Sequence, residues 1–489
     1  MKTIKNYLIL LVMSTSLLSC SLEEEPYSFF TPDQFYKTSA DVQAGITAVY
    51  GPLGSLYNQV GWQMPNYIAD QMFPRAVVGR DQLPGFTFDP SYAILTTYWT
   101  NCYLGISNAN ALLKNIDGVQ MDATLKSQTK AEAHFMRALF YFHLAKNFGD
   151  VPIRLEPVTG ITESEGPKAP VKEVYALILA DLEIAERDLP ITPSQKGKAF
   201  KGAAIALAAK ANLYNENWPQ ASAKAFQLIS NPGSLGLVTN VKDLWDVTKE
   251  DENRKENIFA VEFSRLPTLV SSEINGFFAP GGSAPIFNKI AYGSQFAYIQ
   301  FFYSFNNNDK RKVLMDTSYV NAAGKRIGQL DPNLKGRAFV LKFVDPQSNG
   351  AAGENNYPIL RFADVLLIHA EAEARANNAP NAAAYESVNK VRRRAFGQPL
   401  NVPSIYDIPT NLNLKDFVNA VLQERSFELC FEGDRWYDLT RTNNFLQVAT
   451  QTNPEYPIRP VQAKHRWFPI PLSEVQTNLK LGGQNPLWQ

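Results

Sequence analysis

Residues 424–442 read ERSFELCFEGDRWYDLTRT, and this stretch decides the fold prediction for the whole chain. Its pattern predicts two helices joined at Gly433, the first beginning at about Leu414. We expect Gly433 to end the first helix in a left-handed conformation and Asp434 to cap the second. Apolar residues recur at helical spacing along the first helix: Leu414, Phe417, Val418, Val421, Leu422 and Leu429.

Charged residues interrupt the apolar face of this first helix. Arg425, Glu428 and Glu432 are three and four residues apart, so a continuous helix would place them on one side. Charges on a face that packs into a core are uncommon and need partners. One interpretation is an acid/base site. The other, which the strongly helical pattern favours, is a buried ion network that clamps one helical hairpin against another.

Four further stretches stand out beside the opening one. They are YWTNCYLGISNANALL (98–113), AEAHFMRALFYFHLAKNFGDVPI (131–153), YPILRFADVLLIHAEA (357–372), and FPIPLSEVQTN (468–478) with QNP at 484–486. In this order, the five stretches resemble the SusD/RagB family, the surface lipoproteins of Bacteroidetes nutrient-uptake systems. The opening stretch resembles the C-terminal signature of that family, and the resemblance spans nearly the whole chain.

The start of the chain predicts a lipoprotein. Two lysines precede a short apolar run, and Leu17-Leu18-Ser19-Cys20 resembles a lipobox, in which the cysteine is acylated after cleavage. A plain secretory signal with an incidental cysteine is the alternative. Glu23, Glu24 and Glu25 resemble the family's signal for export to the outer leaflet, although such a run also fits a solvated linker. We therefore divide the chain into a signal peptide (1–19), an anchor and linker (20–38) and a SusD-like domain (39–489).

The domain is predicted to be mostly α-helical. Helical patterns cover residues 39–57, 97–116, 122–148, 170–189, 201–215, 219–229, 361–377, 381–395 and 417–431. Their Ala-rich pairs resemble tetratricopeptide units, but no fixed 34-residue period is present. We therefore expect about four irregular, tetratricopeptide-like hairpins. Two loop-rich insertions, at about 62–98 and 231–357, interrupt them, and the second contains strand-like runs at 258–263 and 339–343.

The second insertion is rich in aromatic residues. Ten of the 29 residues from Phe277 to Phe305 are Phe or Tyr, among several Gly and Pro. Long loops in a compact domain are commonly functional. We expect most of these rings to form a local core and two or three at most to be exposed for binding.

The composition argues against several classes of function. The formal net charge is +0, so the composition gives no sign of the excess positive charge that is typical of nucleic-acid-binding proteins. None of the four histidines has a metal-binding neighbour pattern, and no nucleotide or serine-hydrolase motif is present, so we expect neither metal nor cofactor. Cys102 and Cys430 are expected to be free, with a disulfide as the alternative.

The resemblance implies a non-catalytic protein that binds a glycan and sits on a TonB-dependent, SusC-like transporter in the outer membrane. Family members that bind peptide are one alternative. A surface glycoside hydrolase is the other, because it needs no more than two well-placed carboxylates. The acids that most suggest such a pair are Glu371, Glu373, Glu428 and Glu432.

The resemblance also places the ligand among loops of the N-terminal third and a mid-chain insertion. The candidates in this sequence are Asp70, Arg80, Tyr98, Trp99 and Asn101. Sugar rings stack on aromatic side chains, while their hydroxyls need polar partners. Trp99 fits a packing role equally well, and Asp70 with Arg80 fits a surface ion pair.

Overall fold

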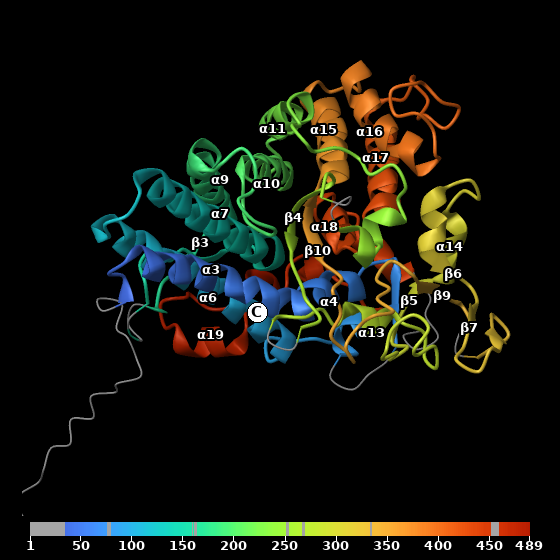
Figure 1. Ribbon diagram of the computed structural model, residues 1–489, viewed down its shortest axis with the longest axis horizontal. Coiled ribbons are helices and arrows are strands. Elements are labelled where there is room, and N and C mark those ends of the chain that lie inside the picture. The colour runs from blue at the N-terminus through green and yellow to red at the C-terminus, as the bar shows by residue number, and fades with distance from the viewer. Residues whose placement is uncertain are drawn as a thin grey trace, which may run out of the picture.

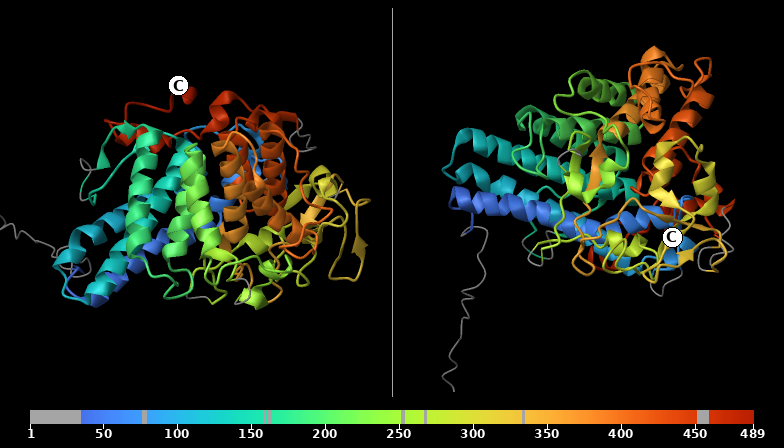
Figure 2. Two further views of the ribbon diagram at one scale, coloured as in Figure 1. Left: turned by 90° about the horizontal axis from the view of Figure 1, so that it is seen from above. Right: turned by 45° about the vertical axis from the view of Figure 1, so that its right-hand side comes forward.

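The computed structural model describes residues 35–75, 80–158, 160, 164–250, 254–266, 269–332, 335–450 and 459–489. The predicted signal peptide (1–19), Cys20 and the acidic run at 23–25 lie outside these residues. The described chain is mostly helical, and its helices stand side by side in antiparallel pairs (Figures 1 and 2). This confirms the predicted fold class.

Four helical hairpins build the scaffold, and successive hairpins pack against each other. They are α3 (Ser39–Asn58) with α6 (Ala93–Asn115), α7 (Ala123–Phe148) with α9 (Val171–Asp188), α10 (Lys201–Tyr214) with α11 (Trp218–Ser230), and α15 (Phe362–Ala376) with α16 (Ala382–Ala395). Helices α17 (Leu414–Glu428), α18 (Asp434–Arg441) and α19 (Leu472–Thr477) follow. The C-terminal helix α19 returns to the α3–α6 end of the scaffold (Figure 1).

Side-chain caps fix where several helices begin. Asp122 accepts a hydrogen bond from the Leu125 amide and caps α7, which agrees with the helix predicted for 122–148. Helix α3 is capped by Thr38, which forms a capping box with Asp41, and its first residue is Ser39, as in the predicted range 39–57. Pro170 was expected as the first residue of the helix at 170–189 and is instead the N-cap of α9, which begins one residue later at Val171.

The two predicted helices of the opening stretch are present, but two details of the prediction were wrong. Helix α17 ends at Glu428, so Glu432 lies in the turn that follows and not on the helix. Gly433 has the expected positive φ of 87°, but it is the N-cap of α18, and Asp434 makes no capping hydrogen bond.

The two loop-rich regions meet in a four-stranded sheet at one end of the scaffold (Figure 1, right). Strand β1 (Met72–Pro74) pairs with β5 (Gln295–Tyr298), which continues to β9 (Arg337–Val340) and β6 (Met315–Asp316). Strand β4 (Asn257–Val261) pairs with β10 (Tyr357–Arg361), which begins 100 positions later in the chain. Further short pairs are β2 (Val151–Pro152) with β3 (Lys168–Ala169), and β7 (Tyr319–Val320) with β8 (Arg326–Ile327).

Short helices also occur in regions that we predicted to lack them. Helix α4 (Val60–Tyr67) continues through Pro65, so the loop-rich character expected from Trp62 onward begins later. The other short helices are α5 (Gln82–Gly85), α13 (Ile274–Phe278) and α14 (Ile299–Ser304). Within the described residues, no helix has the length and hydrophobicity needed to cross a membrane.

Small residues set the distance between neighbouring helices. Helix α10 is buried along nearly its whole length, and its alanines leave room for α9, α11 and α15. Gly105 on α6 lies directly against the fully buried ring of Phe140 on α7. A Cβ atom at Gly105 would lie 2.1 Å from Phe140 Cε2, so the two helices approach at this point because glycine is present.

We therefore expect Gly105→Ala to destabilise the protein. The methyl group must displace a buried ring, which typically costs about 1–3 kcal/mol and outweighs the gain of up to about 1 kcal/mol in helix propensity. Urea unfolding measures the change. Gly118→Ala is the matched control, because no atom lies within 4 Å of the position that its methyl group would take, and it should leave stability unchanged or slightly raised. Equal stability of the Gly105→Ala variant and the wild type would contradict the close packing of α6 on α7.

Candidate functional site

The predicted ligand residues do not form one cluster. Tyr98 and Trp99 are 1% and 4% exposed on α6. The Tyr98 hydroxyl lies 2.8 Å from His143 Nδ1, and Trp99 Nε1 donates to Glu474 Oε2 at 3.3 Å. Asn101 donates to the Thr97 carbonyl within the same helix. The packing role considered for Trp99 therefore fits its position, and no face of either ring is open to a ligand in this arrangement.

Asp70 and Arg80 bind different partners. Asp70 forms a bidentate ion pair with Arg435 of α18, at 2.7 and 2.8 Å, and both side chains are largely buried. This pair joins the N-terminal third to the C-terminal helices. Arg80 instead donates from Nη2 to Gln59 Oε1 at 2.9 Å, so the suggested Asp70–Arg80 surface pair was wrong.

Arg80 reaches the aromatic part of the second insertion. Its guanidinium carbon lies 4.7 Å from the centre of the Phe277 ring, which in turn lies 5.2 Å from the ring of Tyr292. Gln59 Nε2 donates to Glu273 Oε2 at 2.6 Å beside them. We name this group the Arg80–Tyr292 surface: Gln59, Arg80, Glu273, Phe277 and Tyr292.

Tyr292 is the exposed member of this surface. Its side chain is 43% exposed, and its ring lies against Gly276, where a Cβ atom would come within 3.0 Å of it. Partial burial and the nearby Glu273 carboxylate raise the pKa of the Tyr292 hydroxyl, so it remains protonated and able to donate at neutral pH. The surface thus offers an aromatic face beside a carboxylate, an amide and a guanidinium.

Most of the ten aromatic residues between Phe277 and Phe305 belong to the core, as predicted. Phe278, Phe296 and Tyr298 are at most 3% exposed. Tyr292 and Tyr303 are the two with large exposed fractions, 43% and 64%. Tyr303 lies on α14, where its ring contacts Phe302.

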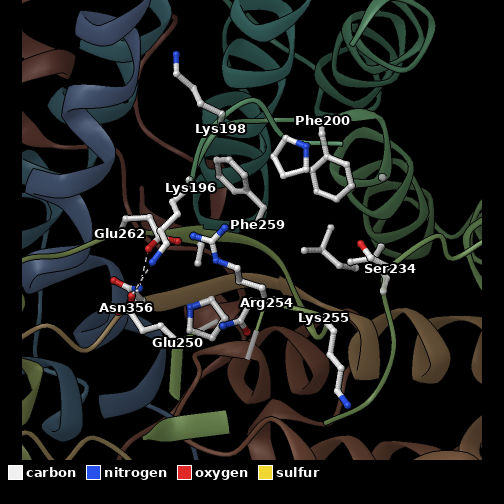
Figure 3. Close-up of a pocket in the computed structure, with 18 of the residues that line it drawn as sticks. Lys196, Lys198, Phe200, Ser234, Glu250, Arg254, Lys255, Phe259, Glu262 and Asn356 are labelled. Atoms are coloured by element: carbon white, nitrogen blue, oxygen red, sulfur yellow. Dashed lines mark hydrogen bonds and ion pairs between the residues drawn. The ribbon is translucent and has the colours of Figure 1, made fainter. Parts of the chain in front are cut away.

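A pocket of about 620 Å³ lies between the helical scaffold and the second insertion (Figure 3). We name it the β4 pocket, because β4 and the residues that follow it form its floor. The remaining walls come from the loop before α10, the loop after α11, the segment 244–250 and residues 354–358. Phe200 and Phe259 supply apolar lining, and Glu250, Glu262 and Asn356 form a polar cluster at one end (Figure 3).

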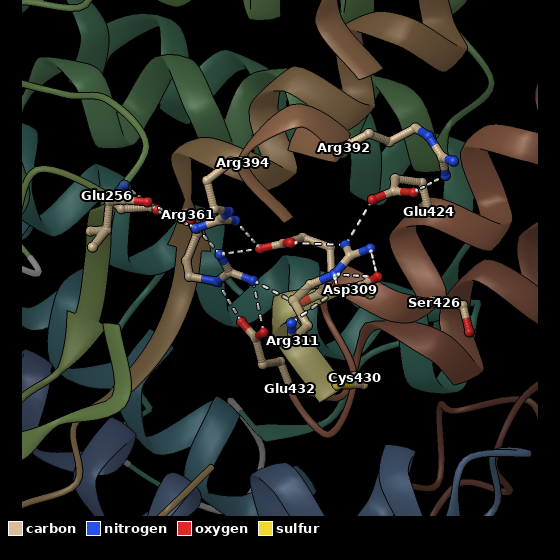
Figure 4. Close-up of polar contacts among 12 residues, drawn as sticks. Glu256, Asp309, Arg311, Arg361, Arg392, Arg394, Glu424, Ser426, Cys430 and Glu432 are labelled. Carbon is tan, nitrogen blue, oxygen red and sulfur yellow. Dashed lines mark hydrogen bonds and ion pairs between the residues drawn. The ribbon is translucent and has the colours of Figure 1, made fainter. Parts of the chain in front are cut away.

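A buried ion network joins the second insertion to α16 and α17 (Figure 4). Glu428 Oε1 lies 2.5 Å from Arg394 Nη2 and 3.1 Å from Arg361 Nη1, and its other oxygen lies 3.1 Å from Arg311. The network has as many acids as bases: Glu256, Asp309, Glu424, Glu428 and Glu432 with Arg311, Lys342, Arg361, Arg392 and Arg394. The ion network predicted from the opening stretch is therefore confirmed.

Arg425 belongs to a second, neighbouring network and not to the one around Glu428. It donates to Asp364 at 2.6 Å and to Asp438 at 2.8 Å, while Lys210 binds Asp364 and Asp434. The expectation that Arg425, Glu428 and Glu432 form one group holds only in part: Glu428 and Glu432 share Arg361, whereas Arg425 has partners of its own.

The acids that suggested a hydrolase have structural partners. Burial alone would raise the pKa of Glu428, but Arg394, Arg361 and Arg311 hold it well below its usual range. Glu371 binds Arg375 and Arg441, which lower its pKa to about 2 despite its burial. A carboxyl group ionised in this way is no general acid at neutral pH.

The residues that the structure describes contain no cluster of three or more His, Cys, Asp or Glu side chains suited to hold a metal ion. Cys102 and Cys430 are both buried and free, as expected. Burial raises the pKa of the Cys430 thiol to about 11, so it has little thiolate character at neutral pH.

Two features escaped the sequence prediction. The β4 pocket is formed by segments near residues 196, 250, 262 and 356, and no local pattern links them. The second is which ring is exposed: two or three rings of the run 277–305 were expected to be exposed, but no local pattern distinguishes Tyr292 from the other nine. The one feature of the sequence that could have indicated an exposed ring was the Gly/Pro-rich composition of this loop.

Known proteins resemble this chain along nearly its full length. Residues 286–488 match the SusD family, and residues 22–213 match a family described as starch-binding associating with outer membrane. SusD-like protein P2 of Formosa agariphila is 26% identical, over 97% of this chain and 98% of its own.

Solved structures share the fold. A SusD homolog from Bacteroides thetaiotaomicron superposes with a TM-score of 0.81 at 22% identity, over 94% of this chain and 98% of its own. A laminarin-binding SusD-like protein superposes with a TM-score of 0.76 at 25% identity, over 92% of this chain and 100% of its own.

We expect Glu428→Ala to destabilise the fold strongly. Removing one partner of a buried ion pair leaves unpaired charge and typically costs about 3–5 kcal/mol, which urea unfolding would show as a lower midpoint. Glu156→Ala is the control, because Glu156 pairs with Lys114 at 3.1 Å on the surface, where such pairs contribute at most about 1 kcal/mol. If both variants unfolded at the midpoint of the wild type, the network would have no role in stability.

Proposed function

Because this chain belongs to the SusD/RagB family, we propose that it is an outer-membrane lipoprotein that captures oligo- or polysaccharide and delivers it to a SusC-like, TonB-dependent transporter. The family consists of binding proteins and not of enzymes, and it is associated with the outer membrane. The carboxylates of Glu428 and Glu371 are held in ion pairs with arginines, which is consistent with a protein that binds its ligand without catalysis.

The observation that carries the proposal is the Arg80–Tyr292 surface. A sugar ring presents an apolar C–H face and a rim of hydroxyl groups. Tyr292 offers an exposed ring for the face, and Gln59, Arg80 and Glu273 offer planar polar groups for the hydroxyls. Because the ring of Tyr292 is supported by Phe277 and Gly276, little side-chain entropy is lost when a ligand covers it.

The glycan itself is proposed by similarity. A SusD-like protein described as laminarin binding is 25% identical to this chain over 92% of its length. Laminarin is therefore the first polysaccharide to test, together with starch and other glucans of different linkage. A neutral glucan agrees with the formal net charge of +0.

We expect Tyr292→Ala to weaken binding of the recognised glycan by about 1–3 kcal/mol, the scale of an interface hot spot. Affinity gels and calorimetry measure the binding, and thermal melting should change little, since a large part of the ring is exposed. Tyr303→Ala is the matched control, because Tyr303 is an exposed tyrosine of the same insertion outside the Arg80–Tyr292 surface. Loss of binding in the Tyr303 variant with full binding in the Tyr292 variant would move the site to α14.

We also propose that Cys20 is the acylated N-terminus of the mature protein. Cys20→Ala should remove the anchor and release the protein from the membrane fraction, which immunoblotting of fractionated cells measures. Replacing Glu23, Glu24 and Glu25 by Ala is the companion variant, which should keep the lipid but reduce protease-accessible display on intact cells. Display of the Cys20→Ala protein at wild-type level would refute acylation as its attachment.

A further inference from the structure

Gln59 lies at the junction of two helices and reaches the Arg80–Tyr292 surface from the helical scaffold. It follows the last residue of α3 and precedes the first residue of α4, and its backbone is not helical, with φ of −141° and ψ of −68°. The Gln63 amide donates to the Gln59 carbonyl at 3.1 Å, which fixes the backbone at this corner. The position of the Gln59 side chain therefore depends on the scaffold and not on the loop-rich insertion opposite it.

The side-chain amide of Gln59 is oriented by two charged neighbours. Its oxygen accepts from Arg80 Nη2 at 2.9 Å, and its nitrogen donates to Glu273 Oε2 at 2.6 Å. Exchanging the amide oxygen and nitrogen would set a donor against the guanidinium and an acceptor against the carboxylate. One orientation of the amide is therefore strongly preferred, and both of its ends are used.

Gln59 separates a base and an acid that attract each other. Burial has the largest effect on the pKa of Tyr292, which the Glu273 carboxylate raises further and the Arg80 guanidinium lowers, so both charges lie near the Tyr292 hydroxyl. In the described part of the chain, Arg80 and Glu273 form no ion pair with each other and are connected through the Gln59 amide. A direct ion pair at the surface would contribute at most about 1 kcal/mol and would use the atoms that a ligand needs.

The remaining polar atoms of Arg80 and Glu273 suit the hydroxyl groups of a neutral sugar. Both side chains are partly exposed, and Arg80 Nε and Nη1 and Glu273 Oε1 have no hydrogen-bond partner among the residues that the structure describes. A guanidinium only donates and a carboxylate only accepts, whereas a hydroxyl group does both. A glycan can therefore accept from Arg80 and donate to Glu273 at the same time. A carboxylate or sulfate group on the ligand would be attracted by Arg80 but repelled by Glu273.

We propose that Gln59 is the positioning residue of this surface: it holds Arg80 and Glu273 apart, so that together they select an uncharged glycan beside the ring of Tyr292. The inference rests on the proposed glycan-binding function and adds to it a residue that acts through its neighbours. Phe277 supports the same arrangement, because the Arg80 guanidinium lies 4.7 Å from the centre of its ring and the ring of Trp62 on α4 lies 5.5 Å from it.

The test compares Gln59→Glu with the wild type in calorimetric titrations of the full chain with laminarin and with soluble starch at pH 7.5. The substitution keeps the shape of the side chain but removes the donor to Glu273 and sets two carboxylates against each other. It should weaken binding of the recognised glucan at least tenfold and change thermal melting little. Gln227→Glu is the matched control, because Gln227 on α11 also donates to a glutamate, Glu186 Oε1 at 2.8 Å, away from this surface. It should bind like the wild type.

Two further variants separate positioning from loss of folding. The double variant Gln59→Glu with Glu273→Gln exchanges the acid and the amide, so the central group again accepts from Arg80 and receives a donor from position 273. It should recover most of the affinity that Gln59→Glu loses. Glu273→Gln alone removes the repulsive carboxylate and should bind the anionic glycan polygalacturonate at least tenfold more tightly than the wild type does.

Each contrary result has a separate meaning. Full glucan binding by Gln59→Glu, with weakened binding by Tyr292→Ala, would overturn this inference and leave the proposed function in place. Binding of polygalacturonate by the wild type as tightly as the glucan would overturn the selection of uncharged glycans. A wild type that bound neither laminarin nor starch would overturn the glucan assignment and this inference with it.

Discussion

The buried ion network around Glu428 is the interaction on which the rest of the structure depends. Removing an acid or a base from water costs several kcal/mol, and the protein recovers this cost when each charge has partners at hydrogen-bonding distance. Glu428 meets that condition through Arg311, Arg361 and Arg394, which come from three different parts of the chain. The loss of one partner therefore affects the position of all three segments.

The network also explains why loop-rich segments can present defined surfaces. Arg361 on β10 binds Glu256, beside β4, and Glu432, beside α18. The second insertion is thus fixed to the helical scaffold at its two ends, and its interior residues pack between them. Both the Arg80–Tyr292 surface and the β4 pocket lie where this insertion meets the scaffold, so the same charges that stabilise the fold keep each of them in shape.

Local sequence signals predicted the helices well, because helix formation depends on neighbouring residues, although the cap of α18 was assigned to the wrong residue. Asp122 shows this at α7, where one side chain fixes the start of a helix. The candidate site was predicted poorly, because exposure depends on residues far away in sequence. Tyr98 and Trp99 occur at the edge of a predicted loop, yet His143 and Glu474 hold them in the core. Glu432 was misplaced for a local reason, since α17 ends at Glu428 and the following turn includes Phe431 at a positive φ of 65°.

The contact between Asp70 and Arg435 has a consequence for the order of folding. These residues are 365 positions apart, and the pairing of β1 with β5 closes a loop of more than 200 residues. Neighbouring helices such as α6 and α7 meet within a short span, so they can associate while the chain is still being synthesised. The sheets and the ion network can form only after the C-terminal part of the chain has been synthesised. A truncated or stalled chain would therefore expose the edges of β1 and β4, which makes the unfinished protein prone to aggregation.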